Sequence, residues 1–415
     1  MTSKSSLSPV VTGMGIVSAI GWNIDTFREA LLAGRSQFTY LQRVGRQGTQ
    51  PFIGAEIVED ALTDRLANYG RLLRGSSLST QMALAVALEA WTTAKLSLPA
   101  THPDRIGLVI GGSNINQRYQ QQTWQHYQTH PEFLLPTYGL SVWDSDAVGV
   151  VSQALQIQGE GYTVGGASAS GAIALIQAAR QVQWGLTDIS LAIGSLADLS
   201  SWECQGLINL GAMGSERFAS QPHLACRPFD QAADGFIYGE SCGAVILENP
   251  IHAEQRNATI YGQLCGWGMV LDGNRHPNPN VIGEEKAMRA ALTMAGLLPE
   301  QINYVNTHGT GSPLGDQTEV AALKSVGLSH CWLNATKSLT GHGLSAAGVV
   351  EVITTLLQLQ ANCCHPTANL INPIDQTLQW VQEKPISARM NYALSNSFGF
   401  GGINTSLVLA KEHSG

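Results

Sequence analysis

The stretch TVGGASASGAIALI, residues 163–176, passes from an extended segment through two glycines into a helix of small and apolar residues. A helix that begins at such a turn presents unpaired backbone N–H groups and the positive end of its dipole. Ser168 stands at that turn. The sequence ASASG does not match the GxSxG pattern of a nucleophile elbow. Taken alone, the turn therefore has two interpretations: a tight strand-to-helix crossing, or the position of a reactive serine.

On both sides of this stretch, apolar β-branched runs alternate with helical patterns, and most runs end in glycine. This alternation predicts an α/β fold with helices packed on both faces of largely parallel sheets. Strands are expected at residues 9–17, 105–112, 189–197, 242–248, 259–270, 302–309, 330–337, 393–399 and 406–410. Helices are expected at residues 81–91, directly after 171, and at 284–297, 316–326 and 344–360.

The second half of the chain repeats the pattern of the first, and the polar stretch at residues 249–258 lies between them. We predict an internal duplication packed as one unit. Residues 1–250 form the half that carries Ser168, and residues 251–415 form the half that carries His308 and His342.

Composition excludes several classes of function. The chain has 415 residues and a net charge of −8, without a basic run, which argues against a nucleic-acid or anionic membrane partner. Neither a signal peptide nor an apolar run long enough to span a bilayer is recognised, so a cytoplasmic location is expected. The seven cysteines lack CxxC spacing, which predicts reduced thiols and no metal site.

Two histidines lie in glycine-rich contexts. VNTHGTGSPLGD, residues 305–316, puts His308 just after an expected strand, and TKSLTGHGLSAAG, residues 336–348, puts Lys337 and His342 on a loop before a helix. A lone loop histidine is usually structural, whereas two in such settings indicate a site. The first stretch is not a P-loop, because no GK[ST] follows.

NSFGFGGINTS, residues 396–406, alternates phenylalanine and glycine. Phe398 and Phe400 can wall a pocket while the backbone around Phe400 approaches it closely. The other interpretation of this stretch is a bulged strand end.

Together these motifs resemble those of the elongating type of β-ketoacyl carrier-protein synthase, in the thiolase superfamily, over nearly the whole chain. VVTGMGIVSAIG (10–21) and ACRPFDQAADGFIYGES (225–241) belong to the same set, in the same order. The resemblance implies a thiolase-like five-layer αβαβα fold and a homodimer. It also implies a tunnel for the phosphopantetheine arm of an acyl carrier protein, with no other cofactor and no metal.

The resemblance also assigns roles to the catalytic candidates. His308 and His342 are expected to donate hydrogen bonds to the thioester oxygen, supported by the ion pair of Lys337 and Glu351.

The remaining site candidates are expected to contact the pantetheine arm or to gate the acyl pocket. Thr310 and Ser312 are expected to line the pantetheine arm, where the family more often has two threonines. Phe400, with Phe398 and Gly399, is expected to gate the acyl pocket and supply an oxyanion N–H.

One departure decides the expected function. Where the family carries its nucleophilic cysteine, in a pattern like ACASG, this chain has Ser168. Condensation needs a thiolate to take over an acyl group, and an unactivated serine stays protonated. Decarboxylation of a malonyl thioester needs only stabilisation of the enolate oxygen. The chain thus resembles the stand-alone decarboxylases of polyketide β-branching, which make acetyl carrier protein for an HMG-synthase-like partner.

Two alternatives stay open at this point. One is a non-catalytic partner like a chain-length factor, although such a protein has no need of the two histidines. The other is an acyltransferase in which His308 or His342 deprotonates Ser168.

Two surface features are candidates for contacts with partners. Arg71 and Arg74 form a short basic cluster that suits an acidic carrier protein. Trp124 and Trp143 flank a glutamine-rich insertion, where a dimer contact or the pocket rim is expected.

Overall fold

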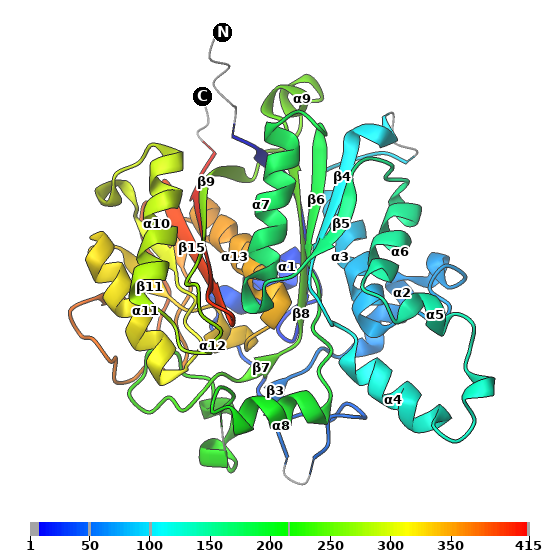
Figure 1. Ribbon diagram of the computed structural model, residues 1–415. Helices are drawn as coiled ribbons and strands as arrows, with labels where there is room; N and C mark the ends of the chain where they lie inside the picture. The colour runs from blue at the N-terminus through cyan, green and yellow to red at the C-terminus, as the bar shows by residue number, and fades with distance from the viewer. Residues whose placement is uncertain (1–7, 49–50, 99–101, 215, 413–415) are drawn as a thin grey trace.

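One mixed β-sheet organises the molecule in the computed structural model, which describes residues 8–48, 51–98, 102–214 and 216–412 (Figure 1). In the order of the sheet its strands are β13 (Gln379–Trp380), β11 (Trp332–Asn334), β10 (Tyr304–Asn306), β15 (Tyr392–Gly399), β16 (Ile403–Ala410), β9 (Gly262–Leu271), β1 (Val10–Ser18), β8 (Ser241–Glu248), β6 (Ile189–Gly194), β4 (Ile106–Gly111) and β5 (Gly161–Val164).

Two groups of five strands share one order and one set of directions. In the group β5-β4-β6-β8-β1, β4 is parallel to both neighbours, and β8 is antiparallel to both. In the group β11-β10-β15-β16-β9, β10 and β16 repeat this pattern. An internal duplication would produce such a repetition. The boundary between the two halves of the chain near residue 250 stays a prediction. The expectation of largely parallel sheets was wrong, because antiparallel pairs join the inner strands of each group.

The two strand groups meet along a short ladder between β1 and β9. Val10 pairs with Gln263, and Val11 pairs with Gly262. The polar stretch between the halves forms a short helix, α9 (Pro250–Gln255), whose first backbone N–H groups are capped by Asn249.

Helices cover both faces of each strand group, which gives the five layers (Figure 1). Helices α3 (Leu78–Thr93) and α6 (Ser145–Leu155) cover the outer face of the first group. Helices α10 (Val281–Ala295) and α11 (Pro313–Val326) lie on the outer side of the second. Between the groups lie α7 (Ser170–Gln183) and α13 (Ala347–Ala361), in the largest apolar core. The predicted five-layer fold is confirmed.

The two middle helices approach closely because glycines face each other. A Cβ atom at Gly171 would lie 2.8 Å from the carbonyl oxygen of Ser345, and one at Gly348 would lie 2.5 Å from the backbone nitrogen of Ala172. Both distances are too short for any side chain, so these glycines permit the contact between α7 and α13.

The strands and helices expected from the sequence are present, with bounds shifted by a few residues. Among the described residues, four helices of nine or more residues in the first half were not expected: α1 (Ile24–Leu32), α4 (Gln117–Tyr127), α6 and α8 (Ser201–Asn209). Lys337 lies in a short helix, α12 (Lys337–Thr340), and not on a loop. The remaining short elements are α2 (Leu62–Arg65), α5 (Tyr138–Ser141), the small sheet β2 (Thr39–Tyr40), β3 (Ile53–Ala55) and β7 (Tyr238–Gly239), and the pair β12 (Cys363–Cys364) and β14 (Ile386–Ser387).

The expectation about apolar runs also needs correction. Among the described residues, Leu344–Ala361 is one helical run long and apolar enough to cross a membrane. Most of that run is buried inside the protein, since α13 is the central helix of the middle layer. The length and apolar character of α13 therefore come from its place between the two strand groups.

Replacing Gly348 by alanine tests the contact between the middle helices. We expect the free energy of unfolding to fall by about 1–3 kcal/mol, because the new methyl group overlaps the α7 backbone. Gly206 is the matched control, since it lies in α8 with open space around its Cα. Gly206→Ala should raise stability by up to about 1 kcal/mol, the helix preference of alanine over glycine. Urea denaturation of both variants measures this difference, and equal effects would contradict the packing argument.

Candidate active site

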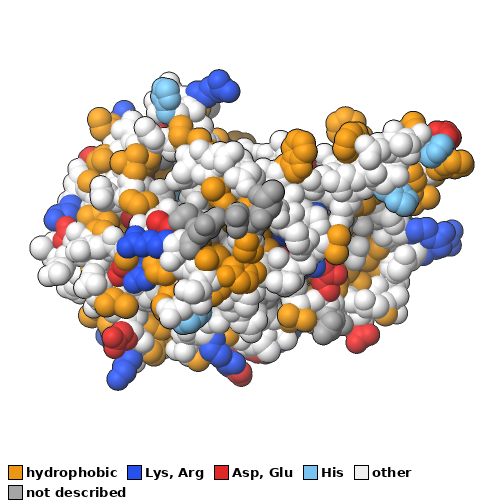
Figure 2. Space-filling view, turned by 90° about the horizontal axis from the view of Figure 1, so that it is seen from below, with side chains coloured by type: hydrophobic (Ala, Val, Ile, Leu, Met, Phe, Trp, Pro, Cys, Tyr) orange, Lys and Arg blue, Asp and Glu red, His pale blue; other side chains and the backbone are white. Residues whose placement is uncertain are grey.

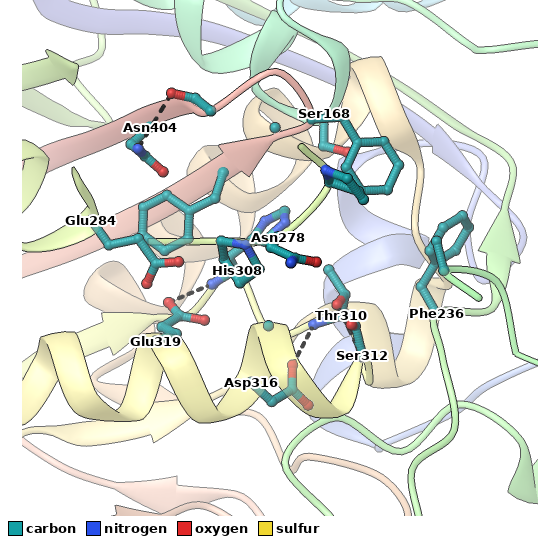
Figure 3. Close-up of a pocket in the computed structure, with 18 of the residues that line it drawn as sticks. Ser168, Phe236, Asn278, Glu284, His308, Thr310, Ser312, Asp316, Glu319 and Asn404 are labelled. Atoms are coloured by element: carbon teal, nitrogen blue, oxygen red, sulfur yellow. Dashed lines mark hydrogen bonds between the residues drawn. The ribbon is translucent and has the colours of Figure 1, made fainter. Parts of the chain in front are cut away.

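A pocket between the two strand groups brings the predicted site residues together (Figure 3). Of the residues named from the sequence, it is lined by Ser168, His308, Thr310, Ser312, His342, Phe398, Gly399 and Phe400. Lys337 and Glu351 do not line it and lie behind His308. Both halves of the chain therefore contribute to one site.

Ser168 sits on a strained turn between β5 and α7. It lies in the single 3-10 turn η5 (Ala167–Ala169), and Ala167 before it has a φ of 48°, in the left-handed region that alanine rarely adopts. The hydroxyl of Ser170 holds this turn, since it accepts from the N–H of Gly166 at 2.9 Å and donates to the carbonyl of Ala167 at 2.7 Å. The turn fixes a nearly buried Ser168 hydroxyl at the pocket wall.

His342 is the direct partner of Ser168. The Ser168 Oγ atom lies 2.9 Å from His342 Nε2, and the backbone N–H of Leu344 donates to His342 Nδ1 at 3.3 Å. Because Nδ1 accepts a hydrogen bond, the proton of the neutral ring is on Nε2. His342 therefore donates to Ser168 and does not act as a base toward it.

His308 is held in the same tautomer by a buried lysine. Lys337 Nζ lies 3.3 Å from His308 Nδ1, and it also donates to the His308 carbonyl and pairs with Glu351. An ammonium group can only donate, so Nδ1 of His308 accepts and Nε2 carries the proton. The two imidazole rings lie 5.6 Å apart and nearly perpendicular.

Both imidazoles are neutral donors at ordinary pH. Burial, with the Lys337 ammonium nearby, lowers the pKa of His308 and of His342 well below the ordinary value of 6.5. Burial also raises the pKa of Glu351 to about 7, although the Lys337 ammonium opposes this. The site thus presents two Nε2–H groups, which can stabilise a developing oxyanion.

The loop at residues 398–402 closes over the serine turn. A Cβ atom at Gly399 would lie 2.4 Å from the carbonyl oxygen of Gly166 and 3.4 Å from the backbone nitrogen of Ser168, so only glycine permits this approach. Phe398 is buried, with its ring 5.5 Å from His308. Phe400 is partly exposed at the pocket and followed by two glycines of positive φ, an arrangement suited to a gate.

Sequence reasoning missed two acids that hold the His308 loop. Glu319 accepts from the N–H of His308 at 2.8 Å and from that of Gly309 at 2.9 Å, while Asp316 accepts from the N–H of Thr310 at 3.1 Å (Figure 3). Both are buried on α11, and burial raises the pKa of each. Their spacing of i and i+3 on one helix face was the available signal, because acids on a buried face need partners.

Two domain families match most of the chain. Residues 8–253 match the β-ketoacyl synthase N-terminal domain, and residues 261–371 match the β-ketoacyl synthase C-terminal domain. The chain belongs to the β-ketoacyl synthase family.

Two relatives match this chain over almost its full length. The polyketide biosynthesis malonyl-ACP decarboxylase PksF of Bacillus subtilis (strain 168) is 48% identical over 409 residues, which cover 99% of this chain and 98% of that protein. The 3-oxoacyl-[acyl-carrier-protein] synthase 2 of Coxiella burnetii is 31% identical, over 97% of this chain and 98% of that protein.

Solved structures share the fold. A type II polyketide ketosynthase in complex with its acyl-carrier protein and bound to a hexaketide superposes with a TM-score of 0.87 at 26% identity, over 98% of this chain and 99% of that one. A β-ketoacyl synthase from Burkholderia phymatum has a TM-score of 0.86 at 28% identity, over 98% of this chain and all of that one.

The other candidates from the sequence lie outside the pocket. Trp124 and Trp143 do not line it and are mostly exposed, so they do not form its rim. Arg71 and Arg74 are exposed in a turn before α3. All seven cysteines are free thiols, and no cluster of three or more metal-ligating side chains occurs in the part of the chain that the structure describes.

The protonation state of the two histidines can be measured directly. At pH 6 an ordinary histidine, with a pKa of about 6.5, is mostly protonated. We expect His308 and His342 to remain neutral there, because burial lowers both pKa values, and to gain protons only at lower pH. Nitrogen-15 NMR of labelled histidines, with His308→Gln and His342→Gln for assignment, would show this. Titration of either ring at pH 6.5 would contradict the donor role of that ring, with free histidine as the reference.

Proposed function

We propose that this protein decarboxylates a malonyl group carried on an acyl carrier protein and releases acetyl carrier protein. The observation that carries the proposal is the pair of neutral Nε2–H groups of His308 and His342, which reach one pocket from separate loops. When carbon dioxide leaves, negative charge collects on the thioester oxygen, and two fixed donors in a buried pocket stabilise it.

The pocket offers no group suited to condensation. Its lining among the described residues contains no cysteine, and Cys226, near Lys337, is buried with its Sγ directed at the Lys337 carbonyl. Ser168 occupies the position of the nucleophilic cysteine of the family. Its hydroxyl accepts a hydrogen bond from His342 Nε2, so His342 does not act as a base that activates it. Decarboxylation needs no covalent acyl intermediate, and these residues suffice for it.

The relatives support the same chemistry. PksF, nearly half identical over almost the full length, is named a malonyl-ACP decarboxylase of polyketide biosynthesis. The ketosynthase in complex with an acyl-carrier protein supports a carrier protein as the partner. In our proposal Thr310 and Ser312 contact the pantetheine arm, and Phe400 gates the pocket. A place in β-branching beside an HMG-synthase-like enzyme, in the cytoplasm, stays a prediction.

The first experiment is intact mass spectrometry of malonyl carrier protein incubated with the purified protein. We expect the carrier to lose the mass of one carbon dioxide. His308→Ala or His342→Ala should each lower the rate by about 100- to 1,000-fold, the usual effect of losing one oxyanion donor. Ser168→Ala should be tolerated better, because Ser168 breaks no bond in this reaction.

His330→Ala is the matched control, since His330 is exposed and outside the pocket. An unchanged malonyl mass with folded protein would favour the non-catalytic partner, and a stable acyl adduct on Ser168 would favour the acyltransferase. Normal turnover by both pocket-histidine variants would refute the proposed mechanism.

We also propose that the protein is a homodimer. Strand β5 is one of the two edge strands of the sheet, and the segment with α4 and α5 projects from the body on the side of the first strand group (Figure 1). This projecting segment carries the exposed apolar side chains of Trp124, Phe133, Leu135, Leu140 and Trp143. Figure 2 shows several apolar side chains on the surface at this end of the molecule. Such a group of apolar side chains is typical of an interface.

Light scattering of the protein purified alone tests this proposal. We expect the mass of two chains, and Trp143→Ser with Leu140→Ser should shift it toward one chain. A monomer at micromolar concentration, or a requirement for a second subunit, would contradict the homodimer.

A further inference from the structure

One acidic side chain of the pocket has no role in the chemistry described so far. Glu284 lies in the first turn of α10 and lines the same pocket as Ser168 and His308. Its side chain is 1% exposed, and its Oε2 atom has no hydrogen-bond partner among the described residues. A buried glutamate without a partner is rare, because burial of an unpaired carboxylate is costly.

The helix that carries Glu284 is otherwise apolar on this face. Its buried face continues with Ala287, Met288, Ala291 and Leu292. Glu285, the next residue, points outward and pairs with Arg289 at 2.7 Å. Gly283, the residue before Glu284, lets Asp272 approach the start of α10, because a Cβ atom at Gly283 would overlap the carboxylate of Asp272. The chain thus places one glutamate inside the pocket and one outside.

Glu284 is surrounded by other acids. Figure 3 shows its carboxyl group next to that of Glu319, beside His308. Two further acids lie near Glu284: Asp272, just after β9, and Asp316, on α11. The neighbouring strands β15 and β16 contribute neutral amides, those of Asn396 and Asn404. Burial first, and then these three acids, raise the pKa of Glu284 well above 4.5. Glu284 therefore keeps its proton at a pH where an exposed glutamate has lost it.

A decarboxylase needs such a proton and a condensing enzyme does not. Condensation joins the malonyl C2 to an acyl group, whereas release of acetyl carrier protein requires a C2–H bond instead. We propose that Glu284 is the proton donor for C2, an inference that rests on the proposed function.

The reaction consists of the loss of carbon dioxide followed by protonation of C2. The bond between C2 and the malonyl carboxylate breaks, and its electron pair forms an enolate whose oxygen is held by His308 and His342. Carbon dioxide departs. The O–H bond of Glu284 then breaks, its proton bonds to C2, and the Glu284 carboxylate takes a proton from water.

Glu284→Gln tests the inference, because it keeps the shape of the side chain and removes the acidic proton. We expect kcat for malonyl carrier protein to fall by about 100-fold or more, as for other general acids, with KM nearly unchanged. The unchanged protein should lose rate as the pH rises through the raised pKa of Glu284, and the variant should lack that decline. Glu284→Asp should restore part of the rate. The matched control is Glu285→Gln, expected to retain full activity.

The outcomes separate the two proposals. An active unchanged protein with equal kcat and pH profile in Glu284→Gln would overturn the role of Glu284 alone. If Glu284→Gln does not fold, a rate of the unchanged protein that shows no alkaline decline over the pH range in which the protein stays folded would overturn the role of Glu284, whereas an alkaline decline and partial activity of Glu284→Asp would support it. No decarboxylation by the unchanged, folded protein would overturn the proposed function and this inference with it.

Discussion

The buried ammonium group of Lys337 is the constraint on which the rest of the site depends. It contacts the ring and the carbonyl of His308 and is balanced by Glu351. A buried charge of this kind is costly unless it is paired, and removing one partner typically costs several kcal/mol. Here the pairing also fixes which nitrogen of His308 carries a proton. Stability and chemistry are therefore coupled in the same cluster.

The second histidine obtains the same tautomer by different means. At His342 the backbone N–H of Leu344 donates to Nδ1, as the Lys337 ammonium group does at His308. The proton of His342 therefore lies on Nε2, which donates to Ser168. Two unrelated contacts thus give two equivalent N–H groups. The hydroxyl of Ser168 is an acceptor in this arrangement, which explains how a serine can occupy the site without becoming a nucleophile. In our proposal the proton donor of the reaction is a different residue, Glu284 on α10.

Much of this arrangement could be predicted from the sequence, because it depends on local patterns. Glycines beside Ser168, His308 and Phe400 marked the loops, and the alternation of strands and helices predicted helices on both faces of the sheet. The five-layer order and the roles of Lys337 and Glu351 followed from the resemblance to β-ketoacyl synthases. Glu284 could not be found in this way, and the only sequence signal for Glu319 was its i, i+3 spacing from Asp316. Glu284 lies in a helix with ordinary composition, and only the packing of α10 against α11 shows that it faces inward. The mixed strand directions were missed because alternation of strands and helices alone does not distinguish them.

The site also depends on how the two strand groups are joined. Ser168 precedes a helix of the first group, whereas both histidines belong to the second, and the ladder between β1 and β9 spans only two residue pairs. Each group keeps its own outer core, so a small separation of the groups would displace the serine turn from the histidines while both cores persist. Loss of activity in mild denaturant would then precede loss of secondary structure, and turnover would report the docking of the two groups more sensitively than circular dichroism.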